Sequence, residues 1–520
     1  MNSTDLPVYY NVVDILEHNL AARADKVALY SVERTMTFRE VQDEVNQVGN
    51  ALKSLGIRFG ETVAILAPDS AEWVTTFFGV MKIGAIALGL NTLLKAHEYA
   101  YMLRDSCARA IVVHAALLPA ITAIRDQAPD LDHVIVLGAH NHPEYLCFET
   151  WIGEHSTELA ATPTHRDDFC ALNYSSGTTG EPKGILHAHK DYPIIAQLWG
   201  RQVLGLREDD RTFAVAKLFF TFGTGGNLMF PWSVGASCVL FSGSPRDPLQ
   251  VLTMIQRFKP TILYNAPTGY AAALTQDSFA DYDLSSLRLC VSAGEALPAP
   301  IWHAWKERTG LDIIDGIGST EVIHIFISNR PDDIRPGSSG KPVPGFAVRL
   351  IDEQGSDVPP GEIGNLLVKG PCTALSYLHQ YEKSRQTFRG EWLFTGDKYF
   401  ADADGYYWHA GRSDDMLKVG GIWVSPMEVE SMLIRHPAVL ECAVIGRPDQ
   451  SDLIKPYAFV ALKSGHAPSA ALEQELIAYC REHMAEFKRP RWVTFVEELP
   501  KTATGKIQRF KLRALSQIEA

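Results

Sequence analysis

Residues 174–184 read Tyr-Ser-Ser-Gly-Thr-Thr-Gly-Glu-Pro-Lys-Gly, a short stretch that packs hydroxyl side chains around Gly177 and Gly180 and adds one cation, Lys183. Glycines let the backbone curl and approach a ligand closely, while hydroxyl and amide groups turn toward an anion. Gly184 follows the lysine, so the Gly-Lys-Ser/Thr ending of a Walker loop is absent. The stretch predicts a polyphosphate-binding loop, and an exposed Ser/Gly turn is the plainer alternative.

Amphipathic helices and apolar strands alternate on both sides of this loop. Thr37 and Glu40 form a capping box ahead of a helix that Gly56 ends. Residues 62–67 then read as a buried strand and 72–83 as a second helix. Because this alternation continues well past the middle of the chain, we predict parallel α/β layers.

The pattern changes between about residues 340 and 410. Short apolar runs at 346–351 and 364–369 are separated by Gly, Pro and Asp turns, which predicts a small, mostly antiparallel β unit. A helix capped by Ser425, with Pro426 at its first position, then opens a further unit. Strands at 439–445, 456–462 and 492–496 and a helix at 470–483 complete the α+β unit.

The chain of 520 residues is too long for one ordinary core, so we expect several domains. The predicted fold is α/β, with a large N-terminal domain over residues 1–411 that combines layered α/β units and the small β unit. A hinge at 412–415 and a small α+β domain over 416–520 follow.

Composition limits the kinds of partner and the cellular compartment that we expect for the chain. The net charge is −13 and no Lys/Arg-rich run stands out, so we expect no nucleic-acid partner. The eight cysteines are scattered without a Cys-x-x-Cys pair, as in a reducing compartment. No signal peptide is visible at the N-terminus, and apolar stretches such as 111–124 are too short to span a bilayer. We expect a cytoplasmic protein with no membrane partner.

Two short turns carry polar groups suited to a nucleotide. In residues 316–321, Gly-Ile-Gly-Ser-Thr-Glu, glycines bring the backbone near a base, Thr320 suits a phosphate oxygen and Glu321 suits Mg²⁺. In residues 395–397, Thr-Gly-Asp, the carboxylate of Asp397 suits two ribose hydroxyls. Each turn also has a plainer interpretation, as a glycine turn before a helix or as a turn-forming Asp.

A polar loop near the C-terminus, residues 500–506, reads Pro-Lys-Thr-Ala-Thr-Gly-Lys. Lysines in such a loop are ordinarily only solubilising. Together with the phosphate loop and the two turns, however, this order of motifs resembles the acyl-adenylate-forming enzymes, which include acyl-CoA ligases, peptide-synthetase adenylation domains and firefly luciferase. The resemblance covers essentially the whole chain.

Within that superfamily the chain resembles most the benzoate–CoA ligase branch. The stretches that carry this narrower resemblance are 216–220, 265–270, 315–321, 324–326 and 414–419. Most of the superfamily has an aromatic residue in the place of Ile317, but the benzoate branch does not.

The resemblance implies roles for individual residues. Catalysis falls to Lys506, Thr320 and Glu321, with Glu321 also holding the metal, and Asp414 is the hinge. Three further groups would bind ligands. For the nucleotide they are Ser175, Ser176, Thr178, Thr179, Lys183, Gly294, Glu295, Ala296, Asp315, Gly316, Ile317, Gly318, Ser319, Asp397 and Arg412. For coenzyme A they are Lys418, Gly420 and Gly421. For the acid they are Thr221, Phe222, Gly223, Gly318, His324 and Ile325.

The implied reaction has two halves and uses ATP, Mg²⁺ and coenzyme A. An aryl carboxylate first attacks the α-phosphate to give an acyl adenylate, and coenzyme A then displaces AMP. Between the halves a mobile C-terminal domain swings about Asp414, withdraws Lys506 and brings residues 418–421 to the site. Adjacent glycines suit a narrow pantetheine tunnel.

The nature of the acid and of the acceptor stays open. Thr221 and Phe222 stand where the benzoate enzymes carry Ala and Tyr, so a hydroxy- or amino-benzoate competes with benzoate itself. Residues 219–223 carry no charge to pair an α-ammonium, which disfavours amino acids. The alternatives are a stand-alone adenylation domain that loads an aryl acid such as 2-aminobenzoate onto a carrier protein, a luciferase-like oxygenase and a non-catalytic nucleotide-binding relative. A homodimer is also left open.

Overall fold

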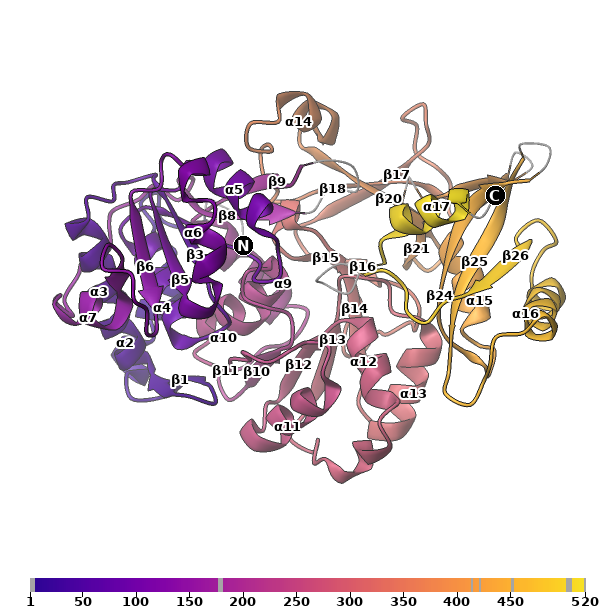
Figure 1. Ribbon diagram of the computed structural model, residues 1–520, viewed down its shortest axis with the longest axis horizontal. Coiled ribbons are helices and arrows are strands. Elements are labelled where there is room, and N and C mark those ends of the chain that lie inside the picture. Colours follow the sequence, from indigo (N-terminus) through magenta and orange to yellow (C-terminus); the bar gives the residue numbers. More distant parts are fainter. Residues whose placement is uncertain are drawn as a thin grey trace.

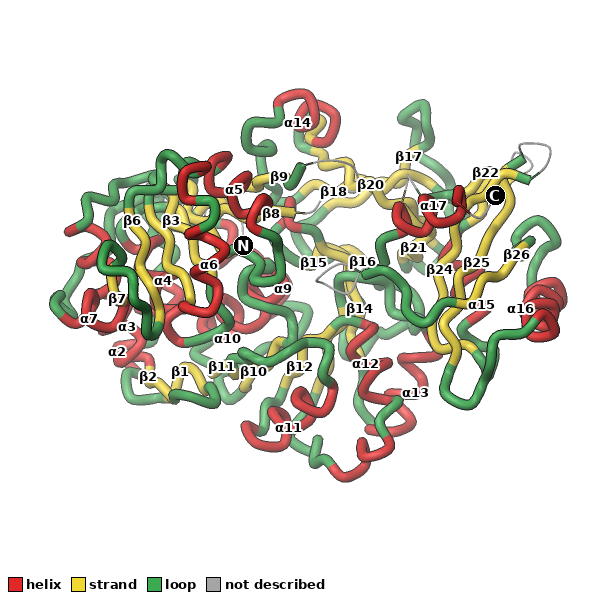
Figure 2. The backbone as a smooth tube through the Cα atoms, in the orientation of Figure 1, coloured by secondary structure: helices red, strands yellow, loops and turns green. Residues whose placement is uncertain are grey.

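The computed structural model describes residues 5–175, 181–412, 415–419, 422–449, 453–501 and 507–518. Figure 1 shows the N-terminal α/β unit at the left, a second α/β unit at the bottom centre, a β unit above it and the C-terminal unit at the right. Figure 2 shows that strands run through the middle of each unit, while helices lie mostly at the outside. The predicted α/β class is confirmed.

The first sheet places the candidate phosphate loop at its edge. In the part of the chain that the structure describes, its strands follow the order β7-β6-β5-β3-β4-β8-β9. All neighbours are parallel except β8 and β9, which are antiparallel. The strands are β3 (Thr62–Leu66), β4 (Ile86–Gly89), β5 (Ala110–His114), β6 (His133–Leu137), β7 (Leu146–Cys147), β8 (Phe169–Ser175) and β9 (Lys183–Ala188).

The second sheet carries the glycine-rich turn at 316–321. Its order is β16-β15-β14-β13-β12-β10-β11-β1-β2, parallel from β14 to β1 and antiparallel at both edges. The strands are β1 (Val27–Tyr30), β2 (Thr35–Thr37), β10 (Arg211–Ala214), β11 (Ser237–Val239), β12 (Ile262–Asn265), β13 (Leu289–Ser292), β14 (Ile313–Gly318), β15 (Ile325–Ser328) and β16 (Lys341–Pro342).

Helices accompany both sheets, as the alternating pattern predicts. They are α1 (Asp14–Glu17), α2 (Leu20–Arg23), α3 (Phe38–Ser54), α4 (Ala71–Lys82), α5 (Ala96–Asp105), α6 (Leu118–Thr122), α7 (Phe148–Gly153), α8 (Asp191–Ile195), α9 (Thr221–Thr224), α10 (Phe230–Ser233), α11 (Pro248–Phe258), α12 (Pro267–Leu274) and α13 (Ala299–Thr309). The capping box of α3 is complete, because Glu40 N donates to Thr37 Oγ1 (3.2 Å) and Thr37 N donates to Glu40 Oε2 (2.7 Å).

The third sheet is antiparallel throughout, as predicted for residues 340–410. It consists of β17 (Ala347–Ile351), β18 (Gly364–Lys369), β19 (Phe388–Arg389), β20 (Trp392–Ala401) and β21 (Tyr407–Arg412), with α14 (Tyr381–Thr387) before β19. Its last pair, β20 and β21, brings Asp397 opposite Arg412.

The C-terminal unit contains a two-stranded ribbon and a three-stranded sheet. Its elements are β22 (Leu417–Val419), β23 (Ile422–Val424), α15 (Pro426–Leu433), β24 (Val439–Pro448), β25 (Ile454–Leu462), α16 (Ala470–His483), β26 (Trp492–Phe495) and α17 (Arg509–Ile518). The sequence did not predict α17, which ion pairs tie to the rest of the unit. Arg509 Nη2 donates to both carboxylate oxygens of Glu430 (2.8 and 2.9 Å), and Arg513 pairs with Asp415.

Large side chains fill the space between sheets and helices. Trp73, Trp199, Trp232 and Trp305 are all buried to within 1% of full enclosure. Within the described ranges, no helix is both long enough and apolar enough to cross a bilayer. The domain limits at 411 and 416 remain predictions.

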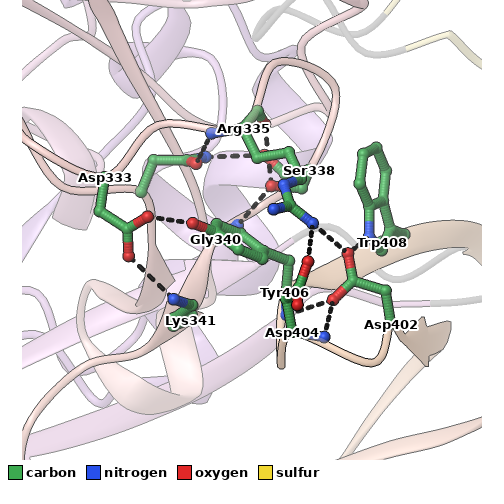
Figure 3. Close-up of polar contacts among 10 residues, drawn as sticks. Asp333, Arg335, Ser338, Gly340, Lys341, Asp402, Asp404, Tyr406 and Trp408 are labelled. Carbon is green, nitrogen blue, oxygen red and sulfur yellow. Dashed lines mark hydrogen bonds and ion pairs between the residues drawn. The ribbon is translucent and has the colours of Figure 1, made fainter. Parts of the chain in front are cut away.

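A polar cluster fixes the β20–β21 hairpin against the loop that follows β15 (Figure 3). Arg335 Nη1 pairs with Asp402 (3.0 Å) and Asp404 (2.9 Å), and its guanidinium lies 4.0 Å from the ring of Tyr406. The Tyr406 hydroxyl in turn donates to Asp333. These ion pairs and the hydrogen bond link the third sheet to the second.

Gly340 lies where this loop passes under the hairpin, and it requires a glycine for two reasons. Its φ is +90°, and an added Cβ would lie 2.0 Å from the carbonyl carbon of Ser328. Its carbonyl also accepts from Tyr407 N (2.8 Å), so the backbone cannot move away without breaking the link to β21.

Gly340→Ala is therefore expected to lower the midpoint of thermal unfolding by several degrees, because backbone strain and overlap act together. Gly355→Ala is the matched control, since Gly355 has nearly the same φ of +88° but nothing within 4 Å of an added Cβ. Differential scanning fluorimetry of both variants checks this, and equal shifts would contradict the role assigned to overlap.

Candidate functional site

The candidate phosphate loop joins two antiparallel strands. Ser175 ends β8, Lys183 begins β9, and the two residues are partners in the ladder. The loop is thus the turn of a hairpin, unlike a Walker loop, which leads from a strand into a helix. Ser176, Thr178 and Thr179 lie outside the described residues.

A segment distant in the sequence runs along the outer side of β9. Leu378 N donates to the carbonyl oxygen of Gly184 (2.8 Å), and Tyr377 forms an antiparallel bridge with Ile185. Lys183 Nζ lies 5.0 Å from the centre of the Tyr377 ring. No sequence motif marks Tyr377, because this contact forms only once the chain has folded.

Tyr377 also connects Lys183 to Glu321. The Tyr377 hydroxyl donates to Glu321 Oε1 (2.7 Å), and Ala374 N donates to the carbonyl oxygen of Glu321 (2.8 Å). The structure therefore brings together two of the predicted residues, Lys183 and Glu321, from different sheets.

Glu321 itself lies in a 3₁₀ turn, Thr320–Val322, directly after β14. The turn ends at Ile323, a β-branched residue with φ +67° and ψ −34°. Such a conformation costs on the order of 1–3 kcal/mol and persists only where surrounding contacts determine it. The orientation of Glu321 is thus imposed by its neighbours.

The electrostatics around Lys183 favour a bound anion. Burial, reinforced by the nearby cations Lys383 and Arg412 and offset only in part by Glu321, lowers the pKa of Lys183 to about 8. A polyphosphate bound here would restore the missing negative charge and favour the protonated lysine.

Strand β14 and the residue that follows it carry the predicted nucleotide residues Asp315 to Ser319. Asp315 is buried, which raises the pKa of its carboxyl group to about 8. Within the part of the chain that the structure describes, neither Asp315 Oδ1 nor Ser319 Oγ has a hydrogen-bond partner. Unpaired buried oxygens are costly, so both are ready acceptors or donors for a ligand.

The glycines of this strand allow β15 to approach closely. An added Cβ at Gly316 would lie 2.7 Å from the carbonyl oxygen of Ile327, and one at Gly318 would lie 2.6 Å from that of His324. Ile317, between them, is half-buried and packs on the core.

The predicted residues Gly294, Glu295 and Ala296 follow β13. Gly294 is exposed, with φ +95° and open space around it. Glu295 contributes to the electrostatic environment of Arg509, which places the start of α17 near this turn.

Asp397 and Arg412 face each other across β20 and β21. Arg412 Nη1 donates to Asp397 Oδ1 (3.0 Å) and to the carbonyl oxygen of Thr395 (3.3 Å). Burial raises the pKa of Asp397, but Arg412 and His409 outweigh it and hold the pKa below its usual value. Asp397 is therefore an ionised acceptor, as the sequence predicts for ribose hydroxyls.

The predicted acid-binding residues surround a buried histidine. Phe222, in the short helix α9, lies with its ring 5.5 Å from that of His324, and Thr221 beside it is buried. Ile325, the first residue of β15, follows His324 and is 1% exposed. Close packing requires a glycine at position 223, because an added Cβ would lie 2.2 Å from the carbonyl oxygen of Lys217.

His324 is enclosed by aromatic rings. The rings of Trp199 and Phe230 lie 4.9 and 4.6 Å from its own. Burial lowers the pKa of His324 to about 3. Neither ring nitrogen has a hydrogen-bond partner among the described residues. A neutral imidazole with one donor and one acceptor thus faces this region.

Several predicted residues lie outside the described ranges: Asp414, Gly420, Gly421 and Lys506, and the side chain of Lys418. Val419, between them, borders a cavity of about 290 Å³ on the C-terminal unit. The cavity is lined by Val419, Lys455, Pro456, Glu486, Phe487, Arg489 and Arg491. Arg489 pairs with Glu486 (2.7 Å) and Lys455 lies 3.8 Å from Asp449, so three cations face two carboxylates and leave a small positive excess, which suits an anionic ligand.

Metal binding would depend on the nucleotide. The described residues contain no group of three His, Cys, Asp or Glu side chains placed to hold an ion. Mg²⁺ commonly binds through one or two carboxylates together with substrate phosphates, so Glu321 beside the phosphate loop fits that ion.

Comparisons with known proteins agree with this geometry. The family described as AMP-binding enzyme matches residues 16–378, and the AMP-binding enzyme C-terminal domain matches residues 428–506. A benzoate–CoA ligase of Thauera aromatica is 45% identical over 513 residues, which cover 98% of this chain and 97% of that protein.

Two solved structures are similar over the full length. The anthranilate CoA ligase AuaEII, in complex with anthranoyl-AMP, has a TM-score of 0.97 and 67% identity and covers 100% of this chain and 99% of that one. A benzoate CoA ligase from Burkholderia xenovorans LB400 has a TM-score of 0.89 and 40% identity and covers 97% and 100%.

Lys183→Met is expected to raise the thermal stability of the ligand-free protein at pH 7. Below about pH 8, Lys183 is charged in the folded protein, which then bears the full cost of burying that charge. Between pH 8 and 10.5, the ordinary pKa of lysine, the residue is protonated mainly in the unfolded chain. Wild-type stability therefore rises with pH across that window. The advantage of the variant should shrink over the same window in thermal melts.

Lys53→Met serves as the control, because Lys53 is an exposed residue on α3. A stabilisation of the same size at Lys53, or one at Lys183 that does not change with pH, would contradict the role of burial.

Proposed function

The chain belongs to the AMP-binding enzyme family, and from this premise we propose that it activates 2-aminobenzoate, or a closely related benzoate, for transfer to coenzyme A. It is an AMP-forming aryl acid–CoA ligase that uses ATP, Mg²⁺ and coenzyme A. The proposal of an ortho-amino substrate rests on the full-length similarity, at 67% identity, to a ligase whose structure contains anthranoyl-AMP.

The first half-reaction turns a poor acyl donor into a good one. A free carboxylate is stabilised by resonance, whereas its mixed anhydride with AMP is open to attack. Charge builds up between the attacking carboxylate and the α-phosphate, and fixed cations lower that barrier. We assign the cation to Lys506 and a supporting hydrogen bond to the hydroxyl of Thr320. Lys183 and the hydroxyls of Ser175, Ser176, Thr178 and Thr179 would stabilise the leaving pyrophosphate.

Glu321 is the residue that would hold Mg²⁺ beside the phosphates. Tyr377 and Ala374 fix the carboxylate and the backbone of Glu321. The ion would neutralise phosphate charge when bound. The fixed carboxylate of Glu321 would hold the ion close to the phosphate groups that Lys183 contacts.

The nucleoside is assigned to β14 and to the β20–β21 hairpin. The unpaired Asp315 Oδ1 suits the amino group of adenine, and the ionised Asp397, backed by Arg412, suits the two ribose hydroxyls. The backbone of residues 294–296 and 316–319 would lie along the base and the acyl group.

The ring of the acid is assigned to the slot formed by Thr221, Phe222, Gly318, His324 and Ile325. His324 stays neutral at physiological pH, so it does not repel a ring amine and can accept a hydrogen bond from it. Such a bond is worth on the order of 1 kcal/mol when both partners are buried.

In the second half-reaction the thiol of coenzyme A displaces AMP. We propose that residues 416–520 form the mobile domain, that residues 412–415 contain the hinge and that Asp414 is its centre. The motion would withdraw Lys506 and present residues 418–421 to the pantetheine. The basic cavity beside Val419 supports this assignment, because coenzyme A carries several phosphate charges.

A panel of acids tests the substrate. We expect 2-aminobenzoate to give thioester with a kcat/KM about fivefold to tenfold above benzoate, from one added buried hydrogen bond. His324→Phe should reduce that ratio toward one, while benzoate turnover stays within a few-fold of the wild type. The measurement is acid-dependent pyrophosphate exchange, repeated with coenzyme A to detect the thioester.

Two results would overturn the substrate assignment. One is a panel in which decanoate or phenylalanine outperforms every benzoate, because neither fits a compact, uncharged aryl slot. The other is pyrophosphate exchange without thioester, which would restore the carrier-protein alternative that the CoA ligase relatives do not favour.

A reciprocal pair of variants tests the proposed domain motion. Lys506→Ala should lose pyrophosphate exchange by orders of magnitude yet still convert supplied aryl adenylate to thioester, because its charge acts in the first transition state only. Asp414→Pro should retain exchange and lose thioester formation, because proline fixes φ at the hinge. Equal losses in both half-reactions would contradict the assignment of the two residues to separate steps.

A further inference from the structure

A buried histidine–aspartate pair lies directly behind the Thr320–Glu321 turn. His187, on β9, is fully buried, and its Nε2 lies 2.7 Å from the carbonyl oxygen of Thr320. Its Nδ1 lies 3.0 Å from Asp191 Oδ2, and that carboxylate also accepts from Ala188 N (2.9 Å). We propose that this pair is a positioning device that holds the Thr320–Glu321 turn ready for Mg²⁺ and ATP, an inference that rests on the proposed function.

The partners determine where the protons lie. A carbonyl oxygen can only accept, so Nε2 of His187 must donate to Thr320. The short contact between Nδ1 and Asp191 likewise needs a proton, on one atom or the other. Each contact thus holds one proton and the pair is neutral overall, which suits a site with no exposure to solvent.

Asp191 is itself held rigidly. It begins α8, is 4% exposed and receives the backbone N–H of Ala188, while Cys372 Sγ lies 3.4 Å from its carbonyl oxygen. A rigid carboxylate fixes the plane of the imidazole ring, and the ring in turn fixes the direction of the Thr320 carbonyl.

The turn needs this support because its backbone is strained. The carbonyl of Thr320 accepts both from His187 and from Ile323 N (3.1 Å), and Ile323 is the residue with positive φ. On the other side, Ala374 and Tyr377 hold Glu321. The carboxylate is thus clamped from two directions, and His187 is the part of the clamp that comes from the phosphate-loop hairpin.

The neighbouring His189 shows what a merely structural histidine looks like here. It is equally buried, but its Nδ1 accepts from Val12 N (3.0 Å), which belongs to the N-terminal segment. It makes no contact with Thr320 or Glu321 among the described hydrogen bonds. His189→Leu is therefore a matched control for His187→Leu.

Asp191→Asn is the decisive variant, because it retains shape and polarity. An Asn oxygen in the place of Asp191 Oδ2 would accept from Ala188 N and from Nδ1–H of His187. The neutral ring then has no proton on Nε2, and the bond to Thr320 is lost. His187→Gln should keep the bond to Thr320, because the amide N–H of the glutamine can donate to that carbonyl without Asp191.

The readout is pyrophosphate exchange as a function of Mg²⁺, ATP and aryl acid. We expect His187→Leu and Asp191→Asn to raise the half-saturating Mg²⁺ concentration on the order of tenfold and to lower kcat. The KM for the aryl acid should stay within twofold. In His187→Gln the half-saturating Mg²⁺ concentration should be close to that of the wild type. Adding Asp191→Asn to His187→Gln should not raise that concentration further. His189→Leu should lower the unfolding temperature alone.

The outcomes separate the two proposals. Absence of exchange in the wild type would count against the proposed function. An active wild type, with an unchanged Mg²⁺ response in Asp191→Asn, would overturn the positioning role. So would equal changes in His187→Gln and His187→Leu. If His187→Leu does not fold, Asp191→Asn and His187→Gln still decide, since both retain polar groups at the buried positions.

Discussion

The hydrogen bond from Tyr377 to Glu321 joins segments that are 56 residues apart, and the geometry of the site follows from it. Tyr377 is held by its bridge to β9 of the first sheet. Its hydrogen bond to Glu321 therefore positions a carboxylate just after β14 of the second sheet relative to the first sheet. Lys183, over the same ring, is placed opposite that carboxylate. A cation and an anion from two separate sheets are thus positioned by the same tyrosine side chain, which suits a reaction in which phosphate charge must be held in a fixed place.

Local rules predicted those parts of the fold in which a few adjacent residues determine the outcome. The capping box at Thr37, the Ser425–Pro426 helix start and the helix at residues 470–483 all lie where the pattern placed them. The parallel layers have antiparallel edges, at β8–β9 and β14–β15, because edge pairing depends on tertiary neighbours. The helix α17 went unpredicted because its arginines have their partners in distant segments, at Glu430 and Asp415.

The site divides in the same way. Glycine-rich turns and their carboxylates can be read from short stretches, and the resemblance to a family supplied their roles. Tyr377, His187 and Asp191 carry no motif, and only the folded chain shows that they converge on residues 320–321. The resemblance places His324 among the acid-binding residues, but only the folded chain shows that aromatic rings enclose it, and this enclosure keeps its imidazole neutral.

The cluster in Figure 3 has a kinetic consequence for the proposed reaction. Arg335, Asp402 and Asp404 hold the β20–β21 hairpin, which carries Asp397 and Arg412, on the second sheet. In the proposed rotation of residues 416–520, the assigned ribose anchor Asp397 would therefore belong to the larger part of the molecule. The adenylate would then stay where it was made while the smaller part turned. A reactive intermediate that kept its anchor through such a rotation would go forward to the thiol instead of escaping to be hydrolysed in solution.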